Sequence, residues 1–261
     1  MGSSCYTCGK EYSSKNNLQR YHYEKKPDHA PDSWDKCGEC GRVYESISHH
    51  WGTNPSHEPS LSDYQHDVLT GVLMGDGHVK INGKNAHLTV NIIKRPYLEV
   101  LDDIFSEISN GIRLERTARE SFENSGDMFK TSAENFNDIY QFRTKAHKEI
   151  TPYRDWYSSG KKVWPDTIEM TPTVLKHWYC CDGSYNTSGS HRSIRIGMKN
   201  EKNAKDKVDN YFNQQGLPTP YYNEPSNSVT GSCVAEWGNK DSDALFEYMG
   251  EPVDGFKYKW P

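Results

Sequence analysis

Long apolar segments are what this 261-residue sequence most lacks. Hydrophobic residues make up 34% of the chain, charged residues make up 26%, and the mean hydropathy is −0.93. No apolar run approaches the roughly 18 residues that a membrane-spanning helix needs, and the N-terminal residues lack the apolar core of a signal peptide. We therefore expect no membrane partner and an intracellular location, in the cytoplasm or nucleoid. The length is enough for one large domain or two ordinary ones.

A net positive charge is missing as well. The 31 Lys and Arg residues are outnumbered by 36 Asp and Glu residues, so the formal net charge is −5 and the pI is about 6.1. This balance mildly opposes nucleic-acid binding, because phosphate contacts need Lys and Arg. Acidic residues concentrate in the expected helices, however, and basic residues recur in the expected strands. The net charge alone therefore excludes no function.

An even set of cysteines, which a disulfide framework would need, is also absent. The chain has seven cysteines, of which four form two Cys-x2-Cys pairs and Cys180, Cys181 and Cys233 remain. A reduced protein with metal-binding pairs explains this number better than disulfide bonds do. We expect the adjacent Cys180 and Cys181 to pack in a core.

The first sixty residues contain a repeat. The segments CYTCGKEYSSKNNLQRYHYEKKPDH (5–29) and CGECGRVYESISHHWGTNPSH (37–57) both read Cys-x2-Cys-Gly-basic-x-Tyr, then a polar run, then His-aromatic-x3-Pro-x-His. Zinc prefers four cysteine or histidine ligands in a tetrahedron. Segments this small also bury too little apolar surface to fold without a metal ion. We predict two structural Zn²⁺ sites, one formed by Cys5, Cys8, His22 and His29 and the other by Cys37, Cys40, His50 and His57.

The spacing of these ligands differs from that of the usual zinc finger, so His49 is an alternative to His50. The first copy is basic, which suits DNA binding. A structural clamp that braces a neighbouring domain would have the same sequence features.

The segment LTGVLMGDGHV (69–79) reads as an apolar helix that contains two glycines and ends on Asp-Gly. Each interior glycine costs a helix about 0.5–1 kcal/mol relative to alanine. Residues four apart share a helix face, so Gly71 and Gly75 predict a notch that a second helix enters at backbone-contact distance. The segment LKHWYCCDGSY (175–185) is the candidate partner. Parallel packing would bring Asp76 and Asp182 to the same end.

The segments after these two helices repeat as well. Alternating apolar residues predict strands near 78–82, 87–93, 113–120 and 139–145, and again near 193–199, 221 and 232–238. Apolar residues at helical spacing predict helices at 95–109, before Gly111, and at 201–215, before Gly216. We predict an α+β fold in which one αββαββα unit is used twice, after two small zinc-binding modules. The expected domain ranges are 1–60, 61–165 and 166–261.

Residues 69–77 resemble the signature helix of the LAGLIDADG homing endonucleases, and residues 175–183 resemble the second copy in a single-chain member. The resemblance covers about 61–261 and implies two pseudo-symmetric half-domains that meet at the paired helices and form a saddle over double-stranded DNA. It also implies divalent-metal-dependent hydrolysis of both strands, mobility of an intron or intein, and action as a monomer. The second helix departs from the pattern, because His177 and Cys181 replace the two glycines and leave the notch one-sided or filled.

The resemblance also implies the catalytic residues. The acid at the eighth signature position is Asp76 in one copy and Asp182 in the other, and lysine partners fall at Lys162, with Lys161 as a near alternative, and at Lys259. Two carboxylates at adjoining helix ends repel each other and face the negative ends of the helix dipoles. Mg²⁺ or another divalent cation offsets both effects, since it prefers oxygen ligands.

Outward-facing polar residues on the predicted strands form the expected DNA-binding set, because such side chains contact phosphates or base edges in the major groove. They are Lys80, Asn82, Arg113, Arg116, Arg119, Arg143, Lys145, Arg195 and Lys199. A solvated sheet face would have the same pattern.

The leading hypothesis is a site-specific DNA endonuclease whose zinc modules extend its footprint. One alternative is a DNA-binding regulator on an inactive scaffold, against which the retention of both acids and both lysines argues. The other is an RNA-splicing maturase, which nothing in the sequence separates from the nuclease.

Overall fold

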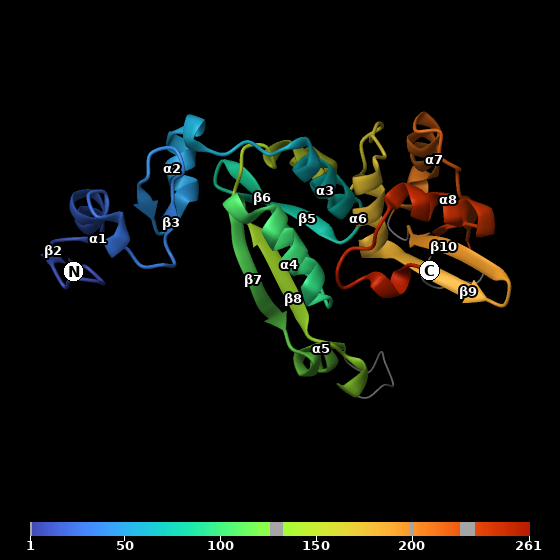
Figure 1. The fold of residues 1–261 in the computed structure, drawn as a ribbon, viewed down its shortest axis with the longest axis horizontal. Helices are drawn as coiled ribbons and strands as arrows, with labels where there is room; N and C mark the ends of the chain where they lie inside the picture. The colour runs from blue at the N-terminus through green and yellow to red at the C-terminus, as the bar shows by residue number, and fades with distance from the viewer. Residues whose placement is uncertain (1, 126–132, 199–200, 225–232) are drawn as a thin grey trace. The chain divides into compact units, whose positions relative to one another are not determined.

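The computed structural model describes residues 2–125, 133–198, 201–224 and 233–261 (Figure 1). The chain divides into two compact units, Met1–Ser60 and Leu61–Pro261. Within the described part of the chain, no helix is long and apolar enough to cross a bilayer.

The smaller unit contains two copies of one small motif, in which a two-stranded hairpin is followed by a helix and a 3₁₀ turn. The first copy comprises β1 (Ser3–Ser4), β2 (Glu11–Tyr12), α1 (Lys15–Leu18), which continues as a π-helical segment (Gln19–Tyr23), and a 3₁₀ turn (Pro27–His29). The second comprises β3 (Asp35–Lys36), β4 (Val43–Tyr44), α2 (Ile47–Thr53) and a 3₁₀ turn (Pro55–His57).

Each hairpin turns through a glycine at the same place. Gly9 and Gly41 have φ of 70° and 68°, a conformation that side chains rarely adopt. Their amides donate to the carbonyls of Cys5 and Cys37 at 2.9 and 2.8 Å. The glycine after each Cys-x2-Cys pair is therefore required by the turn that brings the two thiols together.

The larger unit uses one order of elements twice. The first copy comprises α3 (Asp63–Met74), β5 (Gly77–Asn82), β6 (Asn85–Ile92), α4 (Arg95–Ile104), β7 (Ser109–Arg116), α5 (Ala118–Ser125), β8 (Ile139–Thr144) and a 3₁₀ helix (Thr151–Tyr157). The second comprises α6 (Pro172–Asp182), β9 (Gly183–Ser188), β10 (His191–Gly197), α7 (Lys205–Gln214), β11 (Tyr221–Asn223), β12 (Val234–Trp237) and α8 (Asn239–Met249).

Each copy forms a four-stranded antiparallel sheet with the same topology, β5-β6-β8-β7 in one and β9-β10-β12-β11 in the other. The prediction of a twice-used αββαββα unit in an α+β fold is confirmed. The apolar faces of the central strands form the cores, with Leu88, Val90 and Phe142 fully buried in the first copy and Ile194 and Ile196 in the second.

The structure corrects several local predictions. The strand Gly183–Ser188 was not predicted, because its polar sequence has no apolar alternation and it is held by pairing with β10. Gly111 does not end a helix; it lies inside β7, where the pairing with β8 is irregular. Residues 117–120 were assigned to a strand, but Arg119 lies in α5.

Burial along β5 and β6 also differs from strict alternation. Ile81 was expected inside, but it is 43% exposed near the end of an edge strand. His87 and Thr89 were expected outside, but they are buried because β6 lies between two neighbouring strands. On a central strand, neighbouring side chains cover both faces, and the alternation of residue types in the sequence does not indicate this.

The two helices α3 and α6 pack against each other through the predicted glycines. A Cβ atom on Gly71 would lie 2.4 Å from the carbonyl oxygen of Val174 and 2.9 Å from the Cβ of His177. A Cβ on Gly75 would lie 2.2 Å from the Cβ of Cys181. All three distances are below van der Waals contact, so the predicted notch is confirmed, and the larger residues of α6 fill it.

We predict that Gly71→Ala destabilises the larger unit by about 1–3 kcal/mol, because the added methyl overpacks a backbone contact. Thermal unfolding followed by circular dichroism measures the effect. Gly197→Ala is the matched control, since its Cβ would meet nothing closer than 3.8 Å. Equal melting temperatures for the two variants would contradict the packing described here.

Candidate active site and metal centres

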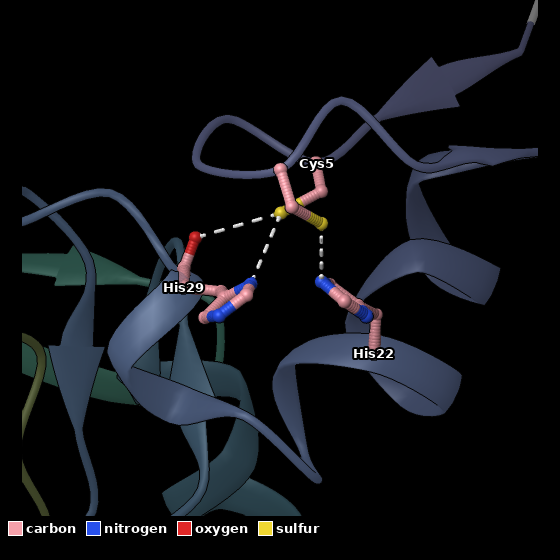
Figure 2. A group of neighbouring side chains, drawn as sticks. Cys5, His22 and His29 are labelled. Atoms are coloured by element: carbon pink, nitrogen blue, oxygen red, sulfur yellow. Dashed lines mark hydrogen bonds between the residues drawn. The ribbon is translucent and has the colours of Figure 1, made fainter.

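The smaller unit brings each predicted set of two cysteines and two histidines together. The four ligand atoms of each set lie within 4.8 Å of one another. In Figure 2, the side chains of Cys5, His22 and His29 point toward one another from the hairpin, the helix and the 3₁₀ turn. In the second cluster the histidine beside the two cysteines is His50, with Nε2 3.6 Å from Cys40 Sγ, while the alternative His49 is exposed.

The donor separations fit a tetrahedral zinc ion. With Zn–S of about 2.3 Å and Zn–N of about 2.0 Å, sulfur and nitrogen donors should lie about 3.6 Å apart and two nitrogens about 3.3 Å apart. The four Sγ-to-nitrogen distances, for the pairs Cys8–His22, Cys5–His29, Cys40–His50 and Cys37–His57, are 3.4, 3.9, 3.6 and 3.7 Å. The nitrogens of His50 and His57 lie 3.1 Å apart. In both sites the first histidine presents Nε2 and the second presents Nδ1.

The protein also favours the ionisation states that a metal needs. Burial would raise the pKa of Cys5, but hydrogen bonds with the backbone amides of Cys8 and Thr7 and with the side chains of Cys8 and His29 together outweigh it and lower that pKa to about 6. Burial, together with the charge of His57, lowers the pKa of His50. Thiolate and neutral imidazole are the forms that bind zinc.

In the larger unit, the paired helices deliver two carboxylates to one place. Asp76 follows the end of α3 after Gly75, and Asp182 is the last residue of α6. A Cβ atom on Gly75 would lie 3.2 Å from Asp182 Oδ2, so this carboxylate reaches across to the end of the partner helix. The two acids therefore lie at the same end of the α3–α6 pair, as predicted.

Desolvation raises the pKa values of both acids, and the charge of Asp76 adds to the rise at Asp182. Burial, together with the charge of Asp76, raises the pKa of Asp182 to about 7, although Lys162 and Lys259 oppose the rise. Burial also raises the pKa of Asp76, against the same two lysines. A site that holds its carboxylates in this way is favourable for a cation.

A lysine lies at the carbonyl end of each helix. Lys162 Nζ donates to the carbonyl oxygen of Gly75 at 2.5 Å, and Lys259 Nζ donates to that of Cys180 at 2.7 Å. Positive charge is favourable there, because the last carbonyls carry the negative end of the dipole. The alternative Lys161 is exposed, and its backbone carbonyl accepts a hydrogen bond from Ser159 Oγ.

Two further residues at this site were missed from sequence. Glu201 lies 3.8 Å from Lys162 Nζ, its side chain is only 10% exposed, and its charge adds to the rise in the pKa of Asp182. Tyr97, on α4, shares a hydrogen bond of 2.8 Å with His177 Nδ1, and both side chains are buried. In the sequence, the hydrogen bond between Tyr97 and His177 was indicated only by the histidine at position 177, where the first signature helix has a glycine.

The predicted DNA-facing residues are in several different environments. Lys80, Asn82, Arg113 and Arg116 are exposed on the edge strands β5 and β7. Arg119 is exposed on α5 and pairs with Glu123. Arg143 is half-buried on β8, and its Nε is a buried atom without a hydrogen-bond partner among the described residues.

Lys145 and Arg195 differ from the exposed members of the set. Lys145 was expected on the outer face but is buried, because it follows the end of β8 and donates to the carbonyl oxygen of Ser109. Arg195 pairs with the buried carboxylate of Glu236 at 2.8 Å. Lys199 lies outside the described residues.

Residues 66–218 match the sequence model of the LAGLIDADG DNA endonuclease family. The chain belongs to this family. The match covers more than half of the chain and includes both signature helices, so the resemblance of residues 69–77 and 175–183 is confirmed.

One solved structure has the same fold over most of both chains. The homing endonuclease I-WcaI bound to its DNA recognition sequence superposes with a TM-score of 0.64 and 18% identity, over 80% of this chain and 91% of that chain. The I-LtrWI LAGLIDADG homing endonuclease bound to target DNA has a TM-score of 0.46 and 9% identity, over 75% and 87%. Full-length DUF199/WhiA from Thermatoga maritima has a TM-score of 0.40 and 12% identity, over 76% and 59%. A search of curated proteins gave no match.

We predict that the purified chain holds two zinc ions and that Cys37→Ala holds one, because this change removes a ligand of the second site only. Elemental analysis measures the content. Cys233→Ala, which removes a buried thiol from the larger unit, should keep both ions. A strong chelator should also expose residues 1–60 to protease, and unchanged protease resistance would contradict the zinc assignment.

We also predict that Asp182→Asn raises the melting temperature at pH 8 when no divalent ion is added. The carboxyl has a pKa of about 7 in the folded chain against an ordinary value of 3.8. The folded state therefore binds this proton more tightly than the unfolded state, and the group's contribution to stability falls as the pH rises from about 4 to 7. The gain should shrink at pH 5, where the wild-type carboxyl is protonated. Asp103→Asn, at an exposed position of α4, is the control, and a gain of equal size there would contradict the prediction.

Proposed function

We propose that this LAGLIDADG protein is a site-specific endonuclease that hydrolyses both strands of a long double-stranded DNA target at the ends of α3 and α6. The observation that supports this proposal is the convergence of Asp76 and Asp182, each accompanied by a lysine at a helix carbonyl end. A reaction at two phosphates needs two sets of catalytic groups, and the internal duplication supplies them in one chain. The protein should therefore act as a monomer.

Asp76 and Asp182 would hold divalent cations, with Mg²⁺ as the expected ion. Their oxygens suit this ion, and its charge would relieve the repulsion that raises the pKa of Asp182. When bound, such an ion activates water and stabilises the charge that develops on the leaving oxygen. The Zn²⁺ ions of residues 1–60 would have a structural role only.

Lys162 and Lys259 would place positive charge beside the scissile phosphates. Each ammonium uses carbonyl contacts to fix its position, and a lysine retains further N–H groups for a phosphate or a water molecule. Burial lowers the pKa of Lys259, while the charges of nearby cysteines and of both aspartates oppose this change.

The two sheets would contact the DNA. The exposed residues Lys80, Asn82, Arg113 and Arg116, with Arg119 on α5, are available for phosphates and base edges, and Arg143 and Arg195 lie on inner strands. The half-domains 61–165 and 166–261 would each cover one half of the target. Lys145 is left out of this set because its ammonium contacts a backbone carbonyl.

Cleavage selection tests the proposal. The full-length protein is incubated with Mg²⁺ and a randomised duplex library, and the cut ends are sequenced, with Ca²⁺ in a parallel reaction. One long motif with short 3′ overhangs is the expected result. Enrichment of bound but uncut DNA would replace the proposal by a DNA-binding regulator, and binding of folded intron RNA alone would replace it by a maturase.

We predict that Asp76→Asn and Asp182→Asn each lower double-strand cleavage more than about 100-fold while DNA binding persists, because each removes an oxygen ligand. Lys162→Met should lower cleavage about 10- to 100-fold, since it removes charge that stabilises the transition state. Lys161→Met is the matched control and should cut normally. Normal cleavage by either aspartate variant would overturn the assignment of the metal site.

A further inference from the structure

The two zinc modules of residues 1–60 form one body. Val43 of the second module packs in the same buried cluster as Leu18 and Tyr23 of the first. Gln19 Nε2 also donates to the carbonyl oxygen of Val43 at 3.2 Å. These contacts fix the helix of one module relative to the hairpin of the other, so the unit presents a single surface.

Two ion pairs cross between the modules. Lys15 pairs with Glu45, and Arg42 pairs with Glu24 at 3.8 Å. Each pair joins a base of one module to an acid of the other. Glu24 and Glu45 border a groove between the modules, and their basic partners reduce the negative charge there.

A groove of about 360 Å³ lies between the modules. It is lined by Asn16, Gln19 and Arg20 from the first helix and by Ser46 and His49 from the start of the second, together with Tyr44 and the two paired glutamates. Asn16, Arg20 and His49 are exposed, whereas Leu18 and Ile47 of the same helices are buried.

The groove contains one cation and one histidine that the fold does not use. Arg20 is exposed, and in the described part of the chain its guanidinium has no ion pair, only a position 5.7 Å from the ring of its neighbour Tyr21. His49 is exposed, since His50 takes the ligand position. Three more exposed lysines, Lys10, Lys25 and Lys26, lie on the first module.

We propose that this groove reads base edges in the major groove of double-stranded DNA, with Arg20 directed at a guanine. Arg20 is the sixth residue of the helix that begins at Lys15, and His49 is the third residue of α2. Helix positions three and six are those from which modules of hairpin and helix contact successive bases. Arginine recognises guanine O6 and N7 with two hydrogen bonds. Since one groove holds both side chains, they would contact neighbouring base pairs.

The remaining charges fit the same partner. Residues 5–29 carry five Lys and Arg residues and three Asp and Glu residues. Lys10, Lys25 and Lys26 of the first module, which lie outside the groove, would contact phosphates, and such contacts set position without selecting sequence. The inference rests on the proposed function only for its partner, double-stranded DNA; the reading groove belongs to a unit that contains none of the proposed cleavage residues.

Binding selection tests the inference without depending on cleavage. The full-length Asp182→Asn protein selects from a randomised duplex library at fixed salt, and the same protein carrying Arg20→Ala is compared with it. We expect Arg20→Ala to lose a guanine preference at one flank of the bound sequence and to bind the selected duplex about tenfold more weakly. Lys36→Ala, which removes an exposed cation of the second module outside the groove, should change affinity less than about twofold.

Zinc content of two ions per chain in each variant shows that the modules are folded. An unchanged guanine preference and affinity in Arg20→Ala would overturn the inference, as would the selection of no sequence or displacement of the duplex by single-stranded RNA. Failure of the proposed nuclease is a separate result. In that case the wild-type protein with Mg²⁺ leaves the selected duplex uncut, while the effect of Arg20→Ala still decides the role of the groove.

Discussion

The close approach of α3 and α6 is the constraint on which the larger unit depends. At Gly71 and Gly75 there is no space for a Cβ atom, and the facing residues of α6 lie against the backbone. This approach makes both helices end at one place. Carbonyls at the helix ends and two carboxylates then share a small volume, and the ammonium groups of Lys162 and Lys259 offset part of this negative charge.

The convergence of the two carboxylates destabilises the folded chain, but it also provides the oxygens for the proposed cation. The ionised form of Asp182 is unfavourable in the folded chain, as its raised pKa indicates, and neither lysine forms a close ion pair with it among the described contacts. Closer ion pairs would stabilise the protein but would occupy the oxygens that a cation needs. The site therefore retains a stability cost that a bound cation would relieve, as is common at functional sites.

The sequence predicted the features that local rules control. Paired glycines, the two Asp-Gly ends and the repeated Cys and His ligands each follow from spacing, and the structure contains them all. Spacing alone left His49 and His50 open, because adjacent residues on a helix point about 100° apart and only the fold selects one. Glu201 and Tyr97 reach the site through contacts between distant segments, and Lys145 turns inward where a strand ends. No local pattern reports such contacts.

The duplication preserves the backbone but not the chemistry of the two sheet faces. His78 and Ser184 follow the two aspartates at equivalent positions, opposite Thr89 and Arg195 in the neighbouring strands. The next strand places Arg143 beside Thr89 but Glu236 beside Arg195. One face thus offers an arginine that no acid in its row neutralises, whereas the other holds its arginine in an ion pair. A homodimer must present the same face twice, but a duplicated chain is free to differ. The proposed DNA target therefore need not be a palindrome, and zinc modules attached to one end of the chain add to that asymmetry.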